Sequence, residues 1–179
     1  MPNNNCYIAL LRGINVSGQK KILMKDLTVL FESLGFTEVR TYIQSGNVVF
    51  SSKNSDGLEE SIHHKIKEVY GWEVPVLVIT PAQLKACLDN CPWEEERQLK
   101  SYYGLLLSTP NPEQIKKLAS YAFEGEFYKI IKNCVYLFYE VGAGKAKIST
   151  NFLERVLKVS CTSRNHRTMT KLLTLASEI

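Results

Sequence analysis

Arginine, lysine and asparagine residues set among glycines are the part of this sequence best suited to chemistry. One such stretch, residues 12–21, directly follows a short apolar run, and a second, residues 44–47, follows another. Glycines let backbone N–H groups approach a ligand closely, while arginine and lysine supply positive charge for a carboxylate or phosphate. We therefore predict an anion-binding site, and its candidate residues are Arg12, Gly13, Asn15, Gly18, Lys21, Gln44, Ser45, Gly46 and Asn47.

The same residues also have a plainer interpretation. Gly13 and Gly18 can simply serve tight turns, and Asn47 tolerates the left-handed backbone conformation that turns require. Under that interpretation the stretch shapes the chain and binds nothing.

Positive charge is concentrated at the two ends of the chain. The formal net charge is +4 at pH 7, and residues 1–21 contain no acidic residue. Residues 141–179 hold seven lysines and arginines against only Glu154 and Glu178. Such a surplus suits an anionic partner, although a solvated basic face is an equally simple explanation.

Met169, Leu172, Leu173 and Ala176 predict a final helix, and its start is a second candidate site. Ser163 or Asn165 can cap its N-terminus, where N–H groups attract anions. Lys147, Arg164 and Asn165 are therefore further candidate ligand residues, and we predict that Arg12 and Arg164 contribute to one anion-binding surface. The alternative is an ordinary capped helix with solvated basic side chains.

The first half of the chain shows the pattern of an α+β fold. Its apolar runs and helical periodicities predict strands at residues 7–11, 39–43, 47–50 and 74–79, with helices at residues 24–34 and 58–69. This β-α-β-β-α-β order is the ferredoxin-like arrangement. Because its first and second strands run parallel, the stretches 12–21 and 44–47 are expected at the same end of the sheet.

The second half repeats this order of elements with different residues. We predict a related β-α-β-β-α unit that ends in an additional helix, packed compactly with the first half. The expected organisation is a ferredoxin-like N-terminal half at residues 1–80, a helical connector at 81–100, and a second α+β half with the C-terminal helix at 101–179.

Three stretches of the sequence, in the same order, resemble the bacterial family catalogued as domain of unknown function 1697. They are residues 9–16, residues 40–50, and residues 162–165 with Thr168 and Lys171. The resemblance covers nearly the whole chain and implies a small α+β fold with a shared, unassigned function. Thr168 joins the candidate ligand residues as a member of the third stretch.

Several classes of site are not expected. The five cysteines include no Cys-x-x-Cys pair and only three histidines accompany them, which predicts reduced thiols, no metal and no cofactor. No apolar run approaches the roughly 20 residues of a membrane span, and the start lacks a signal-peptide core, so a cytoplasmic protein without a membrane partner is expected. His63 and His64 are expected to be solvated, and no nucleophile with an adjacent base is evident.

These observations leave three hypotheses about function. The first is a protein that binds an anionic ligand, either a phosphorylated metabolite, a nucleotide or a nucleic acid, at a basic polar cleft. The second is an enzyme acting on a small anionic substrate at the same place. The third is a protein–protein interaction module. The sequence leaves open whether a reaction is catalysed and which oligomeric state the chain adopts.

Overall fold

The computed structural model describes residues 5–179, which form two compact units. The first unit reaches Lys85 and also contains Lys171–Ile179, and the second is Ala86–Thr170. The end of the last helix thus belongs to the first unit, whereas the sequence assigned it to the second half. This end of the chain bonds to the first unit, where Cys6 Sγ donates to the Ala176 carbonyl oxygen at 3.7 Å and Arg40 Nη1 forms an ion pair with Glu178 Oε2 at 2.8 Å.

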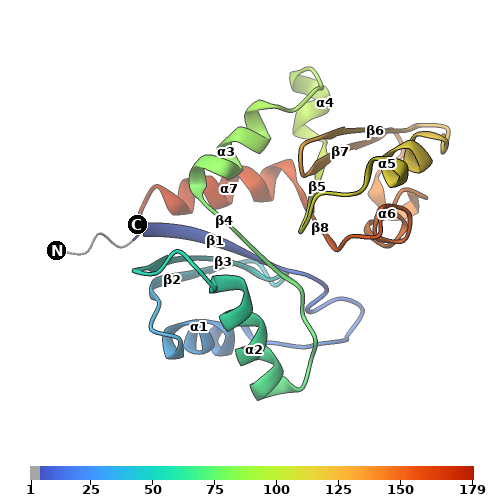
Figure 1. Ribbon diagram of the computed structural model, residues 1–179. Coiled ribbons are helices and arrows are strands. Elements are labelled where there is room, and N and C mark those ends of the chain that lie inside the picture. The colour runs from blue at the N-terminus through green and yellow to red at the C-terminus, as the bar shows by residue number, and fades with distance from the viewer. Residues whose placement is uncertain (1–4) are drawn as a thin grey trace. The chain divides into compact units, whose positions relative to one another are not determined.

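The first unit has the predicted β-α-β-β-α-β order of elements. Its four strands form one antiparallel sheet in the order β2-β3-β1-β4, and helices α1 and α2 lie on the same side of that sheet (Figure 1). The elements are β1 (Asn5–Leu11), α1 (Met24–Ser33), β2 (Thr37–Tyr42), β3 (Asn47–Ser52), α2 (Leu58–Tyr70) and β4 (Val76–Ile79).

The core of the first unit explains why these segments become helices and strands. Helix α1 buries Leu27, Leu30 and Phe31, which recur at the spacing of one helical face. The Phe31 ring lies edge-on to Phe50 of β3, with 5.3 Å between the ring centroids. Burying such a side chain contributes about 1.5–3 kcal/mol, so this contact fixes α1 against the sheet.

The second unit begins within helix α3, at Ala86. Its four strands form an antiparallel sheet in the order β6-β7-β5-β8, which is the order of the first sheet repeated. Its elements, with the two helices that precede them, are α3 (Pro81–Asp89), α4 (Glu95–Leu99), β5 (Tyr102–Leu106), α5 (Pro112–Ala119), β6 (Glu126–Ile131), β7 (Cys134–Tyr139), the 3-10 turn Ala143–Lys145, α6 (Thr150–Leu157), β8 (Cys161–Asn165) and α7 (His166–Ala176).

Strand β8 is an element that the sequence pattern did not predict. It pairs with β5, with Tyr102 opposite Asn165 and Leu106 opposite Cys161. Its segment reads Cys-Thr-Ser-Arg-Asn, and Thr162 and Arg164 are buried polar residues. Because buried positions in it are polar, apolar alternation gives no signal, and the second unit is a complete β-α-β-β-α-β unit.

Within residues 5–179, no helix is both long enough and apolar enough to cross a membrane.

Candidate anion-binding site

Three segments of the first unit meet at the end of β1. The Leu11 N–H donates to the Gly46 carbonyl oxygen at 2.8 Å, and the Arg12 N–H donates to the Pro75 carbonyl oxygen at 2.9 Å. These bonds join the loop after β1 to the β2–β3 hairpin on one side and to the start of β4 on the other. The predicted placement of Arg12 and Gly46 at one end of the sheet is confirmed.

Asn15 holds the loop in place. Its Nδ2 donates to the carbonyl oxygens of Ile22 and Gln44, each at 2.9 Å, and its Oδ1 accepts from the Ile22 N–H at 2.9 Å. Its own backbone N–H donates to the Lys20 carbonyl oxygen at 3.1 Å. Both ends of the amide are therefore used to fasten the loop to itself and to the hairpin, which makes Asn15 a positioning residue.

The loop backbone adopts an unusual series of conformations. Positive φ angles occur at Gly13 (74°), Asn15 (55°), Ser17 (50°), Gly18 (75°) and Lys20 (47°). For residues other than glycine, a left-handed conformation costs about 1–2 kcal/mol, and such costs concentrate at functional sites. The loop therefore has a fixed conformation, and the hydrogen bonds of the Asn15 side chain offset its conformational cost.

Glycine is required at the tip of the hairpin. A Cβ atom on Gly46 would lie 2.8 Å from Leu11 Cβ and 3.0 Å from two side-chain carbons of Ile14, and its φ is 76°. Beside it, Asn47 is fully buried, and its Nδ2 donates to the Tyr42 carbonyl oxygen at 3.0 Å and to Ser45 Oγ at 2.8 Å. Ser45, Gly46 and Asn47 thus shape the hairpin on which the loop packs.

Positive side chains surround this end of the sheet. Lys21 is exposed and Arg12 is half-buried. The Lys20 Nζ donates to the Glu73 carbonyl oxygen at 2.6 Å, which ties the loop to the segment that leads into β4. Lys67 adds a further cation, and it forms an ion pair with Glu73.

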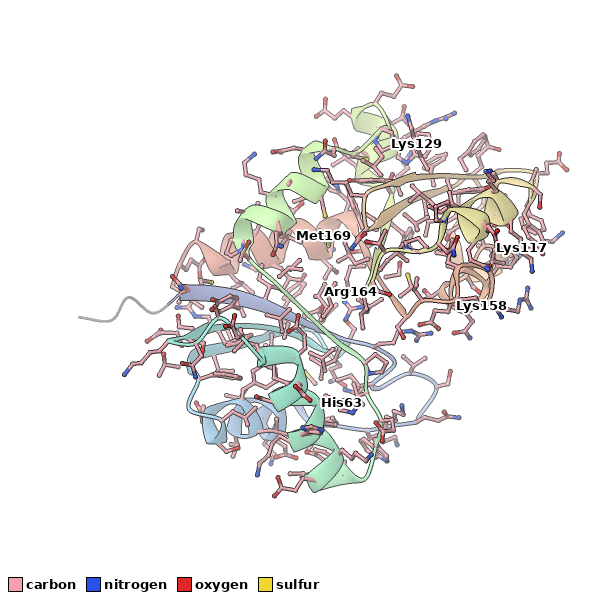
Figure 2. The ribbon with its side chains drawn as sticks, in the orientation of Figure 1. His63, Lys117, Lys129, Lys158, Arg164 and Met169 are labelled. Carbon is pink, nitrogen blue, oxygen red and sulfur yellow. The ribbon has the colours of Figure 1, made fainter. Side chains whose placement is uncertain are left out.

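The Glu73 carboxylate is held by two bases of helix α2. It pairs with Lys67, and its Oε2 lies 2.8 Å from His63 Nε2. The hydrogen bond with Lys67 in the first place, together with the charges of Lys67 and His63, holds the pKa of Glu73 below its usual value. His63, labelled on α2 in Figure 2, also bonds through Nδ1 to the Val74 carbonyl oxygen at 2.8 Å. The expectation that His63 is merely solvated was therefore wrong.

Helix α1 begins at the end of this loop without a side-chain cap. Its N-cap residue is Leu23, whose side chain accepts no hydrogen bond. The N–H groups of the first turn carry the positive end of the helix dipole, which favours a nearby anion. Asp26 in the first turn already supplies one negative charge there.

The second predicted group of residues belongs to the other unit. The Lys147 backbone N–H donates to Glu126 Oε1 at 2.8 Å, and its Nζ lies 5.4 Å from the centre of the Phe123 ring. Arg164, labelled in Figure 2, is only 8% exposed, and its Nη1 donates to Thr162 Oγ1 and to the Ser163 carbonyl oxygen, each at 2.8 Å.

Asn165, one of the two residues proposed for that role, caps helix α7. Its Oδ1 accepts from the Thr168 N–H at 2.9 Å, and the Thr168 side chain is buried. Lys147 is bonded to the first residue of β6, whereas Asn165 ends β8 at the opposite edge of the same sheet. Strands β7 and β5 lie between those two edges.

Arg12 and Arg164 lie in different units, and their shared surface stays a prediction. Among residues 5–179, no group of three or more His, Cys, Asp or Glu side chains is arranged to hold a metal ion. Lys67 and Glu73, which the sequence did not single out, and His63, which it took to be solvated, come together only through the return of the chain from α2 into β4.

Comparison with known proteins identifies the family of this chain. Residues 5–136 match the model of the family described as Protein of unknown function (DUF1697). The chain belongs to this family. The matched range contains the loop and hairpin of the first unit, while Lys147, Arg164, Asn165 and Thr168 lie beyond it. No curated protein matches the sequence.

A solved structure shares the fold. The chain is similar to the conserved bacterial protein SP0830 from Streptococcus pneumoniae, with 24% sequence identity and a TM-score of 0.74. The similarity covers 97% of this chain and 99% of that chain, so both units are included. At this identity the likeness establishes the fold alone.

Proposed function

We propose that the first unit binds a phosphorylated small ligand at the end of β1, through the loop after β1 and the β2–β3 hairpin. The observation that carries the proposal is a difference between the two units. Twelve residues, from Arg12 to Leu23, connect β1 to α1, whereas five residues, from Leu107 to Asn111, connect β5 to α5. The short connection shows that the fold does not need the long one.

The two connections start from the same framework. In the second unit the Leu106 N–H donates to the Asn133 carbonyl oxygen at 2.8 Å, and the Leu107 N–H donates to the Ser160 carbonyl oxygen at 2.9 Å. These bonds repeat those of Leu11 and Arg12 in the first unit. The additional residues of the first loop, with their costly backbone conformations, therefore serve something other than joining a strand to a helix.

The helix that follows each loop supports the same proposal. Helix α5 is capped by Asn111, whose side chain accepts from the Glu113 N–H at 2.9 Å. Helix α1 has Leu23 in that position, which leaves its first N–H groups without a side-chain acceptor. A phosphate oxygen is a suitable acceptor at such a position.

Charge favours the same class of ligand. Arg12 and Lys21 are the candidate cations, and charge-assisted hydrogen bonds to them contribute about 1.5–3 kcal/mol each. The site is shaped by uncharged residues, namely Asn15, Ser45, Gly46 and Asn47. The backbone at Gly13 and Gly18 is open, because a Cβ on either would meet nothing within 4 Å. Gln44 joins loop and hairpin through its carbonyl oxygen.

Calorimetric titration with pyrophosphate, ATP and a sugar phosphate tests the proposal. At least one is expected to bind the wild-type chain and to raise its melting temperature, because ligand at 100 times its Kd adds about 2.7 kcal/mol of stability. Lys21→Ala is expected to weaken that binding about 10-fold or more, with little change in the stability of the free protein. Lys116→Ala, which removes an exposed lysine of α5, is the matched control and is expected to bind normally.

Absence of binding by all three probes contradicts the proposal, as does equal weakening by the two lysine variants. The nucleic-acid hypothesis predicts instead that an oligonucleotide binds with a steep dependence on salt concentration. Turnover of a bound sugar phosphate or nucleotide would identify the site as that of an enzyme.

A further inference from the structure

Four of the five cysteines lie in the second unit, and two of them are in contact. Cys87 lies in helix α3 and is half-buried, while Cys134 is the first residue of β7 and is buried. Their thiols are hydrogen-bonded to each other. Their sequence separation hides this pairing, because it depends on α3 packing against β7.

Tyr136 fixes α3 over this part of β7. Its hydroxyl donates to the Cys87 carbonyl oxygen at 2.9 Å. Cys134 and Tyr136 are two residues apart on one strand and therefore point to the same face of the sheet. The contact between the two sulfur atoms is thus held by a second, independent bond between the same two elements.

The two thiols have opposite electrostatic environments. The hydrogen bond from Cys134, aided by the positive charge of Lys132, lowers the pKa of Cys87, although burial acts against this shift. The hydrogen bond with Cys87 and burial raise the pKa of Cys134. Cys87 is therefore the sulfur with more thiolate character and more access to solvent, which are the two properties of a reactive cysteine.

We propose that Cys87 and Cys134 form a redox-active dithiol, in which a hydroperoxide oxidises Cys87 and Cys134 then closes a disulfide with it. In the first step the Cys87 thiolate attacks H2O2. The O–O bond breaks, an S–O bond forms, and the leaving hydroxide takes up the proton that Cys87 released on ionising to give water. In the second step the Cys134 sulfur attacks the sulfur of the Cys87 sulfenic acid. An S–S bond forms, the S–O bond breaks, and the leaving hydroxide takes the Cys134 proton to give a second water.

The electrons balance over the two steps. Two thiols lose two hydrogen atoms in total, one peroxide is reduced, and two waters are produced. No metal or organic cofactor takes part, and the oxidant is the hydroperoxide itself. The reaction is independent of the function proposed for the first unit, because it uses no residue of that site.

The other cysteines lack this combination of features. Cys161 is buried, and burial raises the pKa of Cys6, which lies in the first unit. Cys91 follows the end of α3, and its thiol is hydrogen-bonded with Tyr103. The structure therefore assigns the reaction to one pair rather than to cysteine in general.

Mass spectrometry of the wild-type chain after treatment with H2O2 tests this proposal. The intact mass is expected to fall by two hydrogen atoms, and digestion without reductant is expected to yield one peptide pair joined through Cys87 and Cys134. Cys87→Ser is expected to abolish this product. In Cys134→Ser the oxidised Cys87 is expected to remain a sulfenic acid, which dimedone traps. Cys91→Ser and Cys6→Ser are matched controls that keep the disulfide.

Three results would overturn the proposal: a peptide map that joins Cys87 to Cys91, a disulfide that still forms in Cys87→Ser, or a wild-type chain in which Cys87 forms no disulfide. Circular dichroism of both Cys134→Ser and Cys134→Ala checks that the buried position tolerates replacement. The peptide map of the wild-type chain decides the question even where neither variant folds.

Discussion

The two units carry different loops on the same framework. In each unit, two successive backbone N–H groups at the end of the first strand donate hydrogen bonds, one to a carbonyl oxygen of the hairpin and one to a carbonyl oxygen of the segment that leads into the fourth strand. The corresponding distances in the two units are equal, at 2.8 and 2.9 Å. From there the second unit reaches its helix in five residues and caps it with Asn111, while the first takes twelve residues and leaves Leu23 at the cap position. The second unit shows how short this connection can be in the same fold, so the additional loop residues of the first unit call for a functional explanation.

The hairpins next to the two loops also differ, in the residue whose carbonyl oxygen is bonded to the first strand. In the first unit the residue bonded to β1 is Gly46, against which Leu11 and Ile14 pack too closely for a side chain. In the second unit the corresponding residue is Asn133, which carries a side chain. That side chain accepts a hydrogen bond from Thr109 Oγ1 of the short loop at 3.0 Å, so the short loop meets its hairpin through a side-chain bond and the long loop through close packing on a glycine.

The largest expected effect comes from filling the space at Gly46. Gly46→Ala adds both a close contact and an unfavourable φ, so we expect a loss of about 3 kcal/mol in the free energy of unfolding by urea. Gly57→Ala is the matched control, because its φ is 68° but a Cβ there meets nothing within 4 Å. That variant is expected to lose about 1 kcal/mol. Equal losses would show that the packing of loop on hairpin is not tight.

Replacing the asparagine of each loop gives the next largest effect. Asn15→Ala removes three side-chain hydrogen bonds and is expected to lower the free energy of unfolding by about 2–3 kcal/mol. Asn111→Ala removes one capping bond and is expected to lower it by about 1 kcal/mol. Calorimetric melting of both variants measures the difference. A loss for Asn111→Ala at least as large as that for Asn15→Ala would contradict the view that Asn15 is the main brace of the long loop.

The fold was largely predictable because its signals are local. The apolar face of α1 and the Ser45-Gly46 turn between β2 and β3 are read from neighbouring residues, and the β-α-β-β-α-β order then places the first loop beside the hairpin. The role of Asn15 was not predictable, because its partners Ile22 and Gln44 are brought to it only by the folded loop.

Strand β8 shows the opposite case. Arg164 was predicted to contribute to an anion-binding surface at the start of the last helix. Its guanidinium donates to Thr162 and Ser163, and its side chain is almost covered. The pairing of Cys87 with Cys134 was hidden for a related reason. The sequence shows which groups are polar or reactive, but only tertiary structure shows which partners they meet.

The smallest expected effect concerns pH. The pKa of Glu73 in the folded chain is below its usual value because of Lys67 and His63, so the stabilisation from its ion pairs is present above the pKa of an unfolded glutamate. It is lost as the pH falls through that value toward the lower pKa of the folded chain. Melting temperatures measured between about pH 3 and pH 6 should therefore fall less steeply for Glu73→Gln than for the wild type.

Glu96 of the second unit provides the matched control for that comparison. Its pKa is also lowered, by the hydrogen bond and charge of Lys100, but that pair lies along a single helix. Glu73 instead links α2 to the segment that holds Lys20, and so to the long loop. Glu96→Gln should consequently change the pH profile less than Glu73→Gln does, and added salt should reduce both differences because both carboxylates are exposed. A larger change for Glu96→Gln would show that the cations near Glu73 do not brace the loop.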